Sequence, residues 1–385
     1  MKKFLLVAGL LALASALFAQ GLGFYGDMVT GFVFTAPGPE NETLPGEKEK
    51  TDIRLKGESV DAPTNRLQLN GEFDGGNYGV KFRLFYDFDT LLTDYTKMRD
   101  VDNLKTYNWG FDPAKQAAWV WGDFFGDFLR LSIGKLGDNK WNTTLDEKWG
   151  LEEYRTGLRA EINPGFGFNG GILFKIPPQY AAAEEKYTFK RLLSEMIIGG
   201  RYDNSLFSAA LAIELDGHDN LRDDEQELTF GFMYRGKPGM QTGVEAKMQN
   251  LGWGNFPFDY TDFSFSVLQM IGYDFSSMFY GRLKIYEKKQ SGADDWTLEM
   301  YPFAIYKFSR WLEVGGELGF GADMNSFADT WYFAIKPLMY YHLGANATLG
   351  AYWYNKFVHC YDYPFSPDKY DKVYTELGLV FYWSF

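Results

Sequence analysis

The feature that most constrains this chain is an alternation of apolar and polar residues in runs of about ten, repeated from one end to the other. In the run 78–88 the apolar face comes from Tyr78 and Val80. The other face carries Lys81 and Arg83. Successive side chains of a β-strand point to opposite faces, so such a run has one apolar and one polar side. A strand of about ten residues, when tilted, is long enough to cross a bilayer.

The alternation predicts an all-β chain with about 18 antiparallel strands, and 16 strands is the alternative. The expected strands cover residues 22–34, 64–74, 78–88, 116–124, 128–136, 154–162, 166–176, 195–202, 205–215, 226–235, 239–249, 262–273, 279–288, 296–307, 311–320, 330–341, 345–355 and 372–385. An even number of strands returns both ends of the barrel to the same side of a membrane.

The connections between these strands alternate strictly between long, polar segments and short turns. The long segments are 35–63, 89–115, 137–153, 177–194, 216–225, 250–261, 289–295, 321–329 and 356–371. The short turns are expected at 75–77, 125–127, 163–165, 203–204, 236–238, 274–278, 308–310 and 342–344. Long loops on one side and short turns on the other are typical of a transmembrane antiparallel β-barrel. A soluble secreted β-protein, the alternative, gives no reason for this alternation.

The last expected strand has one apolar face that ends in an aromatic residue. This face consists of Val373, Thr375, Leu377, Leu379, Phe381, Trp383 and Phe385. It resembles the C-terminal signature of bacterial outer-membrane proteins, and the whole chain is similar in pattern to a porin-like outer-membrane β-barrel. The resemblance implies that the barrel-assembly machinery reads Phe381, Trp383 and Phe385, that outer-membrane lipid surrounds the barrel, and that the protein assembles as a homotrimer.

The N-terminus predicts export. Residues 1–19 combine Lys2 and Lys3, an apolar run and small residues near a cleavage site, which is the pattern of a signal peptide. Residues 20–385 are then expected to form a single outer-membrane barrel domain with long extracellular loops and no N-terminal plug. Cys360 is the only cysteine, so a disulfide within the chain is impossible.

The composition fits a barrel with two unlike faces. Aromatic residues make up 19% of the chain and charged residues 23%, a combination expected when lipid covers the outside and water fills the inside. The formal net charge of −13 argues against nucleic acid as a partner. Only three histidines occur, and we find no nucleophile–base pair, phosphate loop or metal-ligand spacing. The chain is therefore not expected to be an enzyme or to carry a cofactor or a metal.

The polar faces predict which side chains line the pore. The basic ones are Arg66, Lys81, Arg83, Arg130, Arg155, Arg159 and Arg201. The acidic ones are Glu299, Glu313, Glu317 and Glu376. Because the two sets fall on strands of opposite halves, they predict a field across the lumen, which resembles the basic-against-acidic constriction of general porins. The alternative is a solvated lining in which the charges pair locally.

Aromatic residues are also expected inside the last third of the barrel. They are Tyr280, Tyr286, Tyr301, Phe303, Tyr332, Tyr340, Tyr352, Tyr354, Tyr374 and Tyr382. Among them Tyr332 and Tyr352 are taken as pore-lining, similar to the aromatic path of eighteen-stranded sugar porins. The alternative is an interfacial belt on the outside. Segments 89–115 and 137–153 are candidates to fold inward, and Trp141 and Trp149 would anchor the second one. The alternative is that these two tryptophans pack on the rim of the barrel.

The expected function is an outer-membrane porin, a water-filled channel for passive diffusion of small hydrophilic solutes such as ions and sugars. Two alternatives remain open. One is an outer-membrane transporter of hydrophobic compounds, a class that resembles a smaller barrel with an N-terminal hatch. The other is a surface adhesin that uses the long loops, segment 35–63 above all.

Overall fold

The computed structural model describes residues 22–35, 52–55, 66–87, 116–142, 145, 151, 155–176, 196–215, 226–249, 264–289, 296–324, 330–360 and 370–385. The expected signal peptide, residues 1–19, lies outside this description. None of the described residues belongs to a helix long and apolar enough to cross a membrane.

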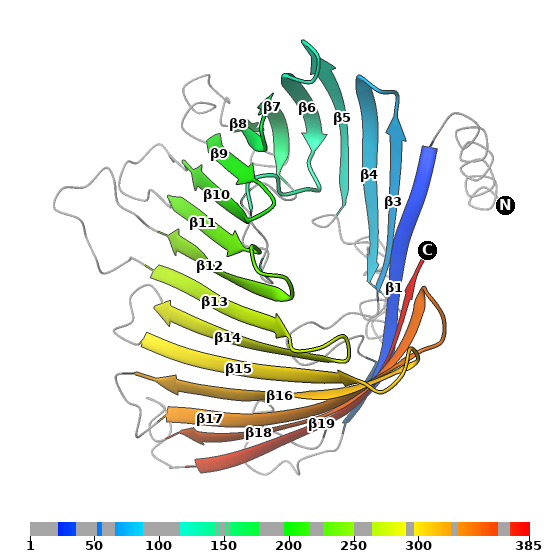
Figure 1. Cartoon of the computed structure of the whole chain (residues 1–385), viewed down its shortest axis with the longest axis vertical. Coiled ribbons are helices and arrows are strands. Elements are labelled where there is room, and N and C mark those ends of the chain that lie inside the picture. The colour runs from blue at the N-terminus through cyan, green and yellow to red at the C-terminus, as the bar shows by residue number, and fades with distance from the viewer. Residues whose placement is uncertain are drawn as a thin grey trace, which may run out of the picture.

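The described residues form one antiparallel sheet of nineteen strands (Figure 1). The strands are β1 (Leu22–Thr35), β2 (Asp52–Leu55), β3 (Arg66–Asp74), β4 (Tyr78–Asp87), β5 (Ala117–Phe124), β6 (Leu129–Lys135), β7 (Thr156–Gly165), β8 (Phe168–Lys175), β9 (Met196–Asp203), β10 (Phe207–Glu214), β11 (Glu227–Tyr234), β12 (Met240–Gln249), β13 (Ser264–Asp274), β14 (Phe279–Lys289), β15 (Trp296–Lys307), β16 (Leu312–Asp323), β17 (Thr330–His342), β18 (Ala347–Cys360) and β19 (Tyr370–Ser384). From β3 to β19 each strand pairs with the next one in the chain, as hairpins do.

The sheet closes because its first and last long strands pair. Residues 27–35 of β1 run antiparallel to residues 376–384 of β19. The other edge of β1 pairs with two strands, residues 22–29 with β3 and residues 32–35 with β2. β2 and β3 therefore lie one after the other along the same edge of β1 and share one position in the barrel. The circumference holds eighteen strand positions. The predicted eighteen-stranded antiparallel barrel is confirmed and the alternative of sixteen is wrong.

Three details differ from the sequence prediction. β2 lies inside segment 35–63, which was expected to be loop alone, and β18 and β19 extend into both ends of the expected loop 356–371. The β7–β8 turn lies at Phe166-Gly167 instead of 163–165, because β7 continues through a bulge between Ile162 and Gly165. Gly167 has a φ of +86°, and an added Cβ there would overlap the Asp203 carbonyl, so this turn requires glycine.

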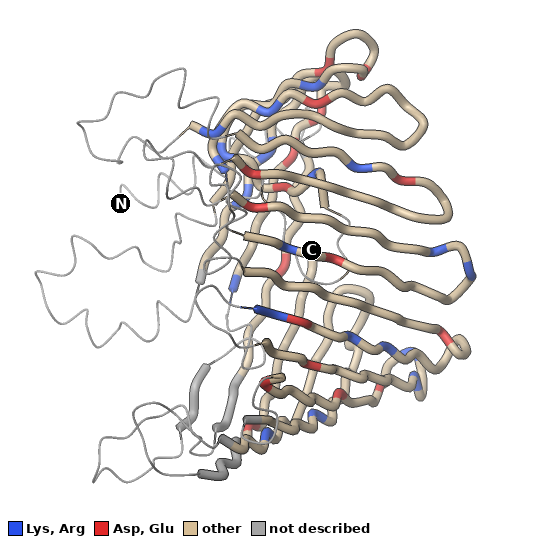
Figure 2. Tube along the Cα trace, turned by 90° about the vertical axis from the view of Figure 1, so that its left-hand side faces the viewer, with Lys and Arg blue, Asp and Glu red and all other residues tan. Residues whose placement is uncertain are grey.

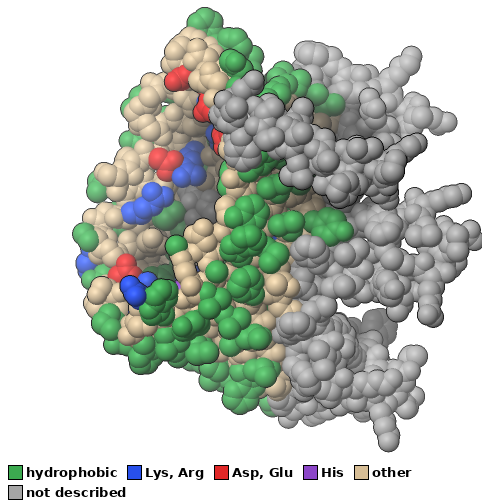
Figure 3. All heavy atoms as spheres, turned by 90° about the vertical axis from the view of Figure 1, so that its right-hand side faces the viewer, with side chains coloured by type: hydrophobic (Ala, Val, Ile, Leu, Met, Phe, Trp, Pro, Cys, Tyr) green, Lys and Arg blue, Asp and Glu red, His purple; other side chains and the backbone are tan. Residues whose placement is uncertain are grey.

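The outward face of the long strands is apolar. In β19, Leu377, Leu379 and Trp383 are 58%, 46% and 42% exposed, whereas Glu376 and Val380, on the opposite face, are buried. In Figure 3 hydrophobic side chains cover much of the outer surface. An apolar exterior of this extent is unfavourable in water and favourable in lipid. A sheet in lipid must also be closed, because the backbone groups of a free edge would have no hydrogen-bond partners there.

Exposed aromatic residues gather at the short-turn end of the barrel. Phe125, Phe166, Phe275 and Phe308 lie in short turns and are at least 60% exposed. Phe166, Phe275 and Phe308 pack on outward-facing neighbours; the Phe308 and Tyr306 ring centroids, for example, are 4.8 Å apart. Such a ring is the aromatic belt expected where lipid meets water. It marks the short-turn end as one edge of the membrane-spanning region.

Candidate functional site

The strand register places the predicted pore-lining residues on the inner face. Side chains that stand opposite each other on paired strands share a face, and this relation can be followed from strand to strand around the barrel. Arg83, for example, stands opposite Asn70 and Ala117, and Glu317 stands opposite Phe303 and Lys336. The inner set comprises Arg66, Lys81, Arg83, Arg130, Arg159, Arg201, Glu299, Glu313, Glu317, Tyr332, Tyr352 and Glu376. The charged residues are distributed along the strands (Figure 2).

Residues 136–142, with Leu145 and Leu151, lie against this inner face, and we call them the inner segment. Leu136, Trp141 and Leu151 are buried in one cluster with inward-facing residues of the wall. The wall contributes Ala117, Trp119, Trp121, Leu173, Ile197 and Ala212 to the cluster. The prediction that part of segment 137–153 folds inward is confirmed for these residues. Segment 89–115 and Trp149 lie outside the described residues.

Trp141 anchors the inner segment, as the sequence predicted. Its indole N–H donates a hydrogen bond of 2.9 Å to Asn169 Oδ1 on β8, and its ring lies on Gly199 of β9. A side chain at position 199 would occupy the space of the ring. Trp119 and Trp121 complete the cluster, and their inward facing could not be predicted from the sequence, because Val120 between them is also apolar. Period-2 alternation identifies a face only when the two faces differ.

Hydrogen bonds tie the same segment to three strands. Asp138 accepts two bonds from the Arg159 guanidinium on β7, at 3.0 and 3.2 Å. The Arg201 guanidinium on β9 donates to the carbonyl oxygen of Asn142. The Leu145 N–H donates to Glu245 Oε1 on β12 at 2.7 Å. The inner segment therefore spans the inner face from β7 to β12 and narrows the barrel from that side.

Ionic contacts fill the wall beneath the inner segment, and we call the inner face of β5–β10 the charged wall. Arg159 is 1% exposed, and its Nε donates to the equally buried Glu161 at 3.0 Å. A buried guanidinium is tolerated only when carboxylates and hydrogen bonds surround it. The buried Glu214 accepts from Lys175 at 2.6 Å and from Arg155 at 3.2 Å, so Arg155 also points to this inner face.

Burial acts to raise the pKa of the Asp138 carboxyl, but the charge and the hydrogen bonds of Arg159 outweigh burial and hold this pKa below its usual range. Asp138 therefore remains a carboxylate well into the acidic range. The sequence did not single it out, since it lies in a segment without strand alternation.

The expected field across the lumen is not found among the described residues, because the charges pair locally. On the side predicted to be basic, Arg130 contacts Asp123 at 2.6 Å and Lys81 contacts Glu72 at 2.6 Å. On the side predicted to be acidic, the pairs are Glu299–Lys288, Glu313–Lys307 and Glu317–Arg282. Four of these five pairs join adjacent strands, and Glu317 reaches Arg282 across β15, so neither wall carries charges of one sign only.

The opposite side of the barrel is aromatic, and we call the inner face of β14–β19 the tyrosine wall. Ile305, Leu338, Tyr352 and Val380 form its buried centre, together with Val29 of the adjacent β1. Tyr280, Phe303, Tyr340, Tyr354 and Tyr382 pack around them. These residues face inward and do not belong to the outer belt. The side chain of Tyr374, the remaining predicted member on β19, lies outside the described residues.

Glycines on neighbouring strands let the tyrosine rings lie flat on this wall. The Tyr352 ring covers Gly378, and the Tyr332 ring covers Gly321. A methyl group at either glycine would overlap the ring. The Tyr352 hydroxyl donates to the buried Glu376, and the Tyr301 and Tyr332 hydroxyls lie 2.6 Å apart. The rings therefore present their faces to the lumen and keep their hydroxyls in contact with the wall.

Cations lie on the exposed faces of several of these rings. Lys356 Nζ lies 4.4 Å from the Tyr332 ring centroid, and Lys336 Nζ lies 4.9 Å from that of Tyr352. The Arg282 guanidinium is 5.0 Å from the Phe303 centroid. Attraction between a cation and the negative face of the ring favours this arrangement. The wall thus offers flat apolar surfaces next to positive charge.

The sequence matches no protein-family model, and no curated protein sequence matches it. Solved structures do align with it. The outer membrane channel DcaP of Acinetobacter baumannii has a TM-score of 0.51 at 11% identity, over 94% of this chain and 97% of that one. OmpT of Vibrio cholerae, expressed in the outer membrane, has a TM-score of 0.50 at 10% identity, over 94% and 97%. At these identities the similarity concerns the fold alone.

Proposed function

We propose that this chain, which has the fold of a porin-like outer-membrane β-barrel, forms a water-filled channel for passive diffusion of small hydrophilic solutes such as ions and sugars. The observation that carries the proposal is a closed circumference of eighteen strand positions with charged side chains on its inner face. Barrels of about eight strands are filled by their own side chains, whereas barrels of 16 to 18 strands leave an aqueous channel.

The inner segment supports this proposal because it lies on one side of the interior. Its described contacts reach β5 to β12, and the tyrosine wall of β14–β19 packs around a separate centre. We infer that solutes pass between the inner segment and the tyrosine wall. The pore-lining set of the sequence prediction then belongs to the walls of this path, with Tyr332, Tyr352 and Glu299 on the tyrosine side.

The setting of the channel is part of the proposal. Residues 1–19 would direct export, and the short-turn end with its aromatic belt would face the periplasm. Phe381, Trp383 and Phe385 lie on the outward-facing side of the C-terminal segment, where the barrel-assembly machinery would read them, and Trp383 and Phe385 are exposed. Assembly as a homotrimer follows from the porin resemblance.

Planar-bilayer recording tests the channel. The purified, folded protein should insert and produce stepwise, ohmic current increments in simple salt solutions. A Trp141→Ala variant loses the anchor of the inner segment and should give larger increments, because the segment no longer narrows the lumen. A barrel whose β-sheet circular dichroism is intact but which passes no current contradicts the proposal.

Liposome swelling separates the channel from its competitors. Liposomes that contain the protein should swell in isosmotic solutions of small sugars. Exclusion of sugars together with uptake of a fatty acid would favour a transporter of hydrophobic compounds. A variant trimmed in segment 35–63 that keeps its conductance but loses attachment to cells or matrix would favour an adhesin.

A further inference from the structure

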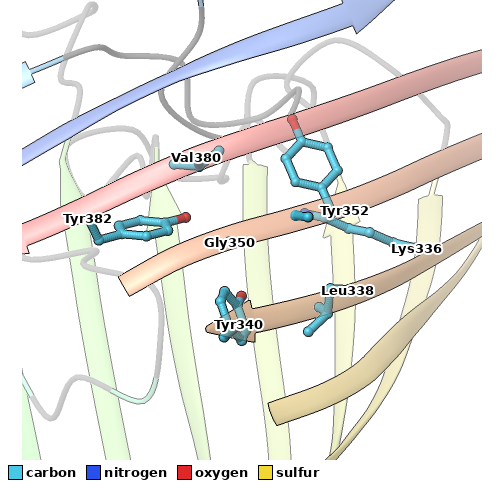
Figure 4. Close-up of a pocket in the computed structure, with 8 residues that line it drawn as sticks. Lys336, Leu338, Tyr340, Gly350, Tyr352, Val380 and Tyr382 are labelled. Carbon is cyan, nitrogen blue, oxygen red and sulfur yellow. The ribbon is translucent and has the colours of Figure 1, made fainter. Parts of the chain in front are cut away.

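The tyrosine wall contains a pocket of about 210 Å³ between β17, β18 and β19 (Figure 4). The inward-facing Tyr340, Tyr352 and Tyr382 form its sides. Figure 4 shows Tyr340 and Tyr382 on opposite sides of Gly350, which lies on the strand between them. The pocket is a concavity of the inner face, so a solute in the lumen can reach it.

The gap between two of these rings exists because residue 350 has no side chain. Gly350 stands opposite Tyr340 on the paired strand. A Cβ added at Gly350 would lie 3.3 Å from the Tyr340 ring and 3.4 Å from the Tyr382 ring. Both separations are below the optimum of about 3.5–4.0 Å for contact between two carbon atoms, so the gap is narrow. A flat ring fits it better than a saturated ring, whose hydrogens project from both faces.

The rest of the lining is apolar, or polar with partners inside the protein. The buried Leu338 and Val380 contribute aliphatic side chains as the floor. The Tyr352 hydroxyl donates to the buried Glu376. The polar lining residues all have further interactions with the protein, namely Lys336, Tyr340, Tyr352 and Tyr382. A sugar is therefore disfavoured, because each hydroxyl that loses water on entry needs a new hydrogen-bond partner.

The charges around the pocket balance each other. Lys336 is the charged residue among the described lining, and its ammonium lies 4.9 Å from the Tyr352 ring centroid. Glu317 stands directly opposite Lys336 on the paired strand β16, and one of its carboxylate oxygens lies 3.8 Å from the Arg282 guanidinium. With Glu376, these residues carry two formal positive and two formal negative charges. Neither sign prevails, so a solute without net charge suits the pocket best.

We infer that this pocket binds small, uncharged compounds that carry one aromatic ring, with benzyl alcohol as a simple probe. The ring would lie between Tyr340 and Tyr382 over the aliphatic floor, in stacked or edge-to-face contact with them. The size is adequate, because an apolar cavity of about 150 Å³ accommodates benzene and the remaining volume accommodates a hydroxymethyl group. The inference rests on the proposed channel, through which the solute reaches the pocket, and gives its lumen a saturable site for one solute class.

Isothermal titration calorimetry on the folded barrel in detergent tests the site without any need for conductance, and titrations into detergent alone provide the blank. Benzyl alcohol should bind the wild-type protein about threefold to tenfold more tightly than cyclohexylmethanol, which carries the same hydroxymethyl group on a saturated ring. Benzoate should bind no more tightly than benzyl alcohol, because the charges around the pocket balance. Equal binding of the flat and the saturated compound, or tighter binding of glucose or benzoate, would overturn the inference.

Substitutions at the two sides of the gap locate the site. Tyr382→Leu removes one ring and should weaken benzyl alcohol binding by about threefold to tenfold, whereas Tyr382→Phe keeps the ring and should stay within about twofold. Gly350→Ala places a methyl group in the gap and should weaken binding by roughly fivefold or more, as overpacking does. Gly344→Ala is its matched control, since Gly344 lies in the β17–β18 turn and an added Cβ there meets no atom within 4 Å.

Circular dichroism shows whether each variant is folded, and if Gly350→Ala does not fold, the two Tyr382 variants decide the test. Unchanged benzyl alcohol affinity in Tyr382→Leu would overturn the inference, because the compound would then bind elsewhere. A loss of equal size in Tyr382→Phe would also overturn it, because the hydroxyl and not the ring would then hold the compound. A loss in Gly344→Ala as large as that in Gly350→Ala would show that the gap is not the site.

Bilayer recording separates failure of the site from failure of the channel. Benzyl alcohol should cause brief current interruptions in the wild type that are reduced in Tyr382→Leu, and cyclohexylmethanol controls for effects of the compound on the lipid. A channel that conducts but shows neither interruptions nor heat of binding overturns the aromatic site and leaves the channel intact. A barrel that binds benzyl alcohol in the calorimeter but passes no current supports the site and contradicts the channel.

Discussion

The charged wall and the tyrosine wall use ionisable side chains in opposite ways. On the charged wall, Arg159 and Glu161 each have side chains 1% exposed and contact each other, and Arg159 also contacts Asp138 of the inner segment. On the tyrosine wall, Lys288 is 42% exposed, and other cations lie on ring faces. The first set is locked into the structure and holds a segment in place. The second set faces the lumen, where it can meet a solute.

The difference between the two walls predicts that replacing Arg159 has the largest effect on stability. Arg159→Met should destabilise the folded protein by about 3–5 kcal/mol, because the buried Glu161 loses the guanidinium that compensates its charge and the partly exposed Asp138 loses its partner. The free energy of unfolding in urea, measured in lipid vesicles, checks this. Conductance should also rise, since the inner segment loses its contact with β7.

Arg66→Met is the control for this experiment. The Arg66–Asp27 pair has side chains about one-third exposed, at 34% and 33%. Its loss should change stability by about 0–1 kcal/mol, as for other solvated ion pairs. Equal effects of the two substitutions would show that the charged wall is not locked as the geometry indicates.

Much of the fold followed from the sequence because alternation and connection length are local properties. The eighteen long strands all occur near their expected positions, and β15 has the expected bounds of 296–307. The same period of two also predicted that the side chain of a residue such as Glu317 points to the inner face of the barrel. Strand β2 was missed because four residues are too short to show a period.

The pairing of charges could not be read from single strands. Whether Lys81 meets Glu72 depends on the relative height of β3 and β4, which register sets and which no single strand shows. The contact of Asp138 with Arg159 depends on how the inner segment folds back, a long-range event without a periodic signal. For these reasons the sequence placed charges on the correct face and still predicted a field across the lumen that the pairs remove.

The tyrosine wall should be most sensitive at its glycines. Gly378→Ala would place a methyl group where the Tyr352 ring lies. The ring must then turn toward the lumen, which should destabilise the protein by about 1–3 kcal/mol, as overpacking does. Single-channel conductance should fall, in contrast to the rise expected from Arg159→Met.

Gly344→Ala is the matched control for this substitution. Gly344 lies in a short turn, and an added Cβ would meet no atom within 4 Å. The stability of the Gly344→Ala variant should differ from that of the wild type by less than about 0.5 kcal/mol, as for other surface positions. If conductance of the Gly378→Ala variant stays at the wild-type level, the ring does not turn into the conducting path.

Acid should release the inner segment before it affects the tyrosine wall. The pKa of Asp138 is lowered in the folded protein, so the carboxylate contributes stability above its unfolded value of about 3.9. That contribution is lost as the pH falls through the lower, folded-state pKa. Between pH 7 and about 4 the segment should remain docked, and conductance should rise only in more acidic solution.

Asp138→Asn provides the comparison for the acid experiment. This variant lacks the carboxylate at every pH, so its conductance at pH 7 should already approach the acid value of the wild type. The part of the acid response that comes from Asp138 should then be missing. An identical acid response in both proteins would show that Asp138 does not control release of the inner segment.

The smallest expected difference concerns ion selectivity. The Lys288 side chain is 42% exposed, so Lys288→Gln removes a positive charge that ions in the lumen can meet. The Arg130 side chain is 29% exposed, contacts Asp123 and lies on the Trp121 ring, so its neighbours cover more of its charge. The first substitution should therefore change the charge that ions encounter more than the second. In a salt gradient the reversal potential should shift toward cation selectivity for Lys288→Gln and change little for Arg130→Gln. A larger shift for Arg130→Gln would reverse the roles that we assign to the two walls.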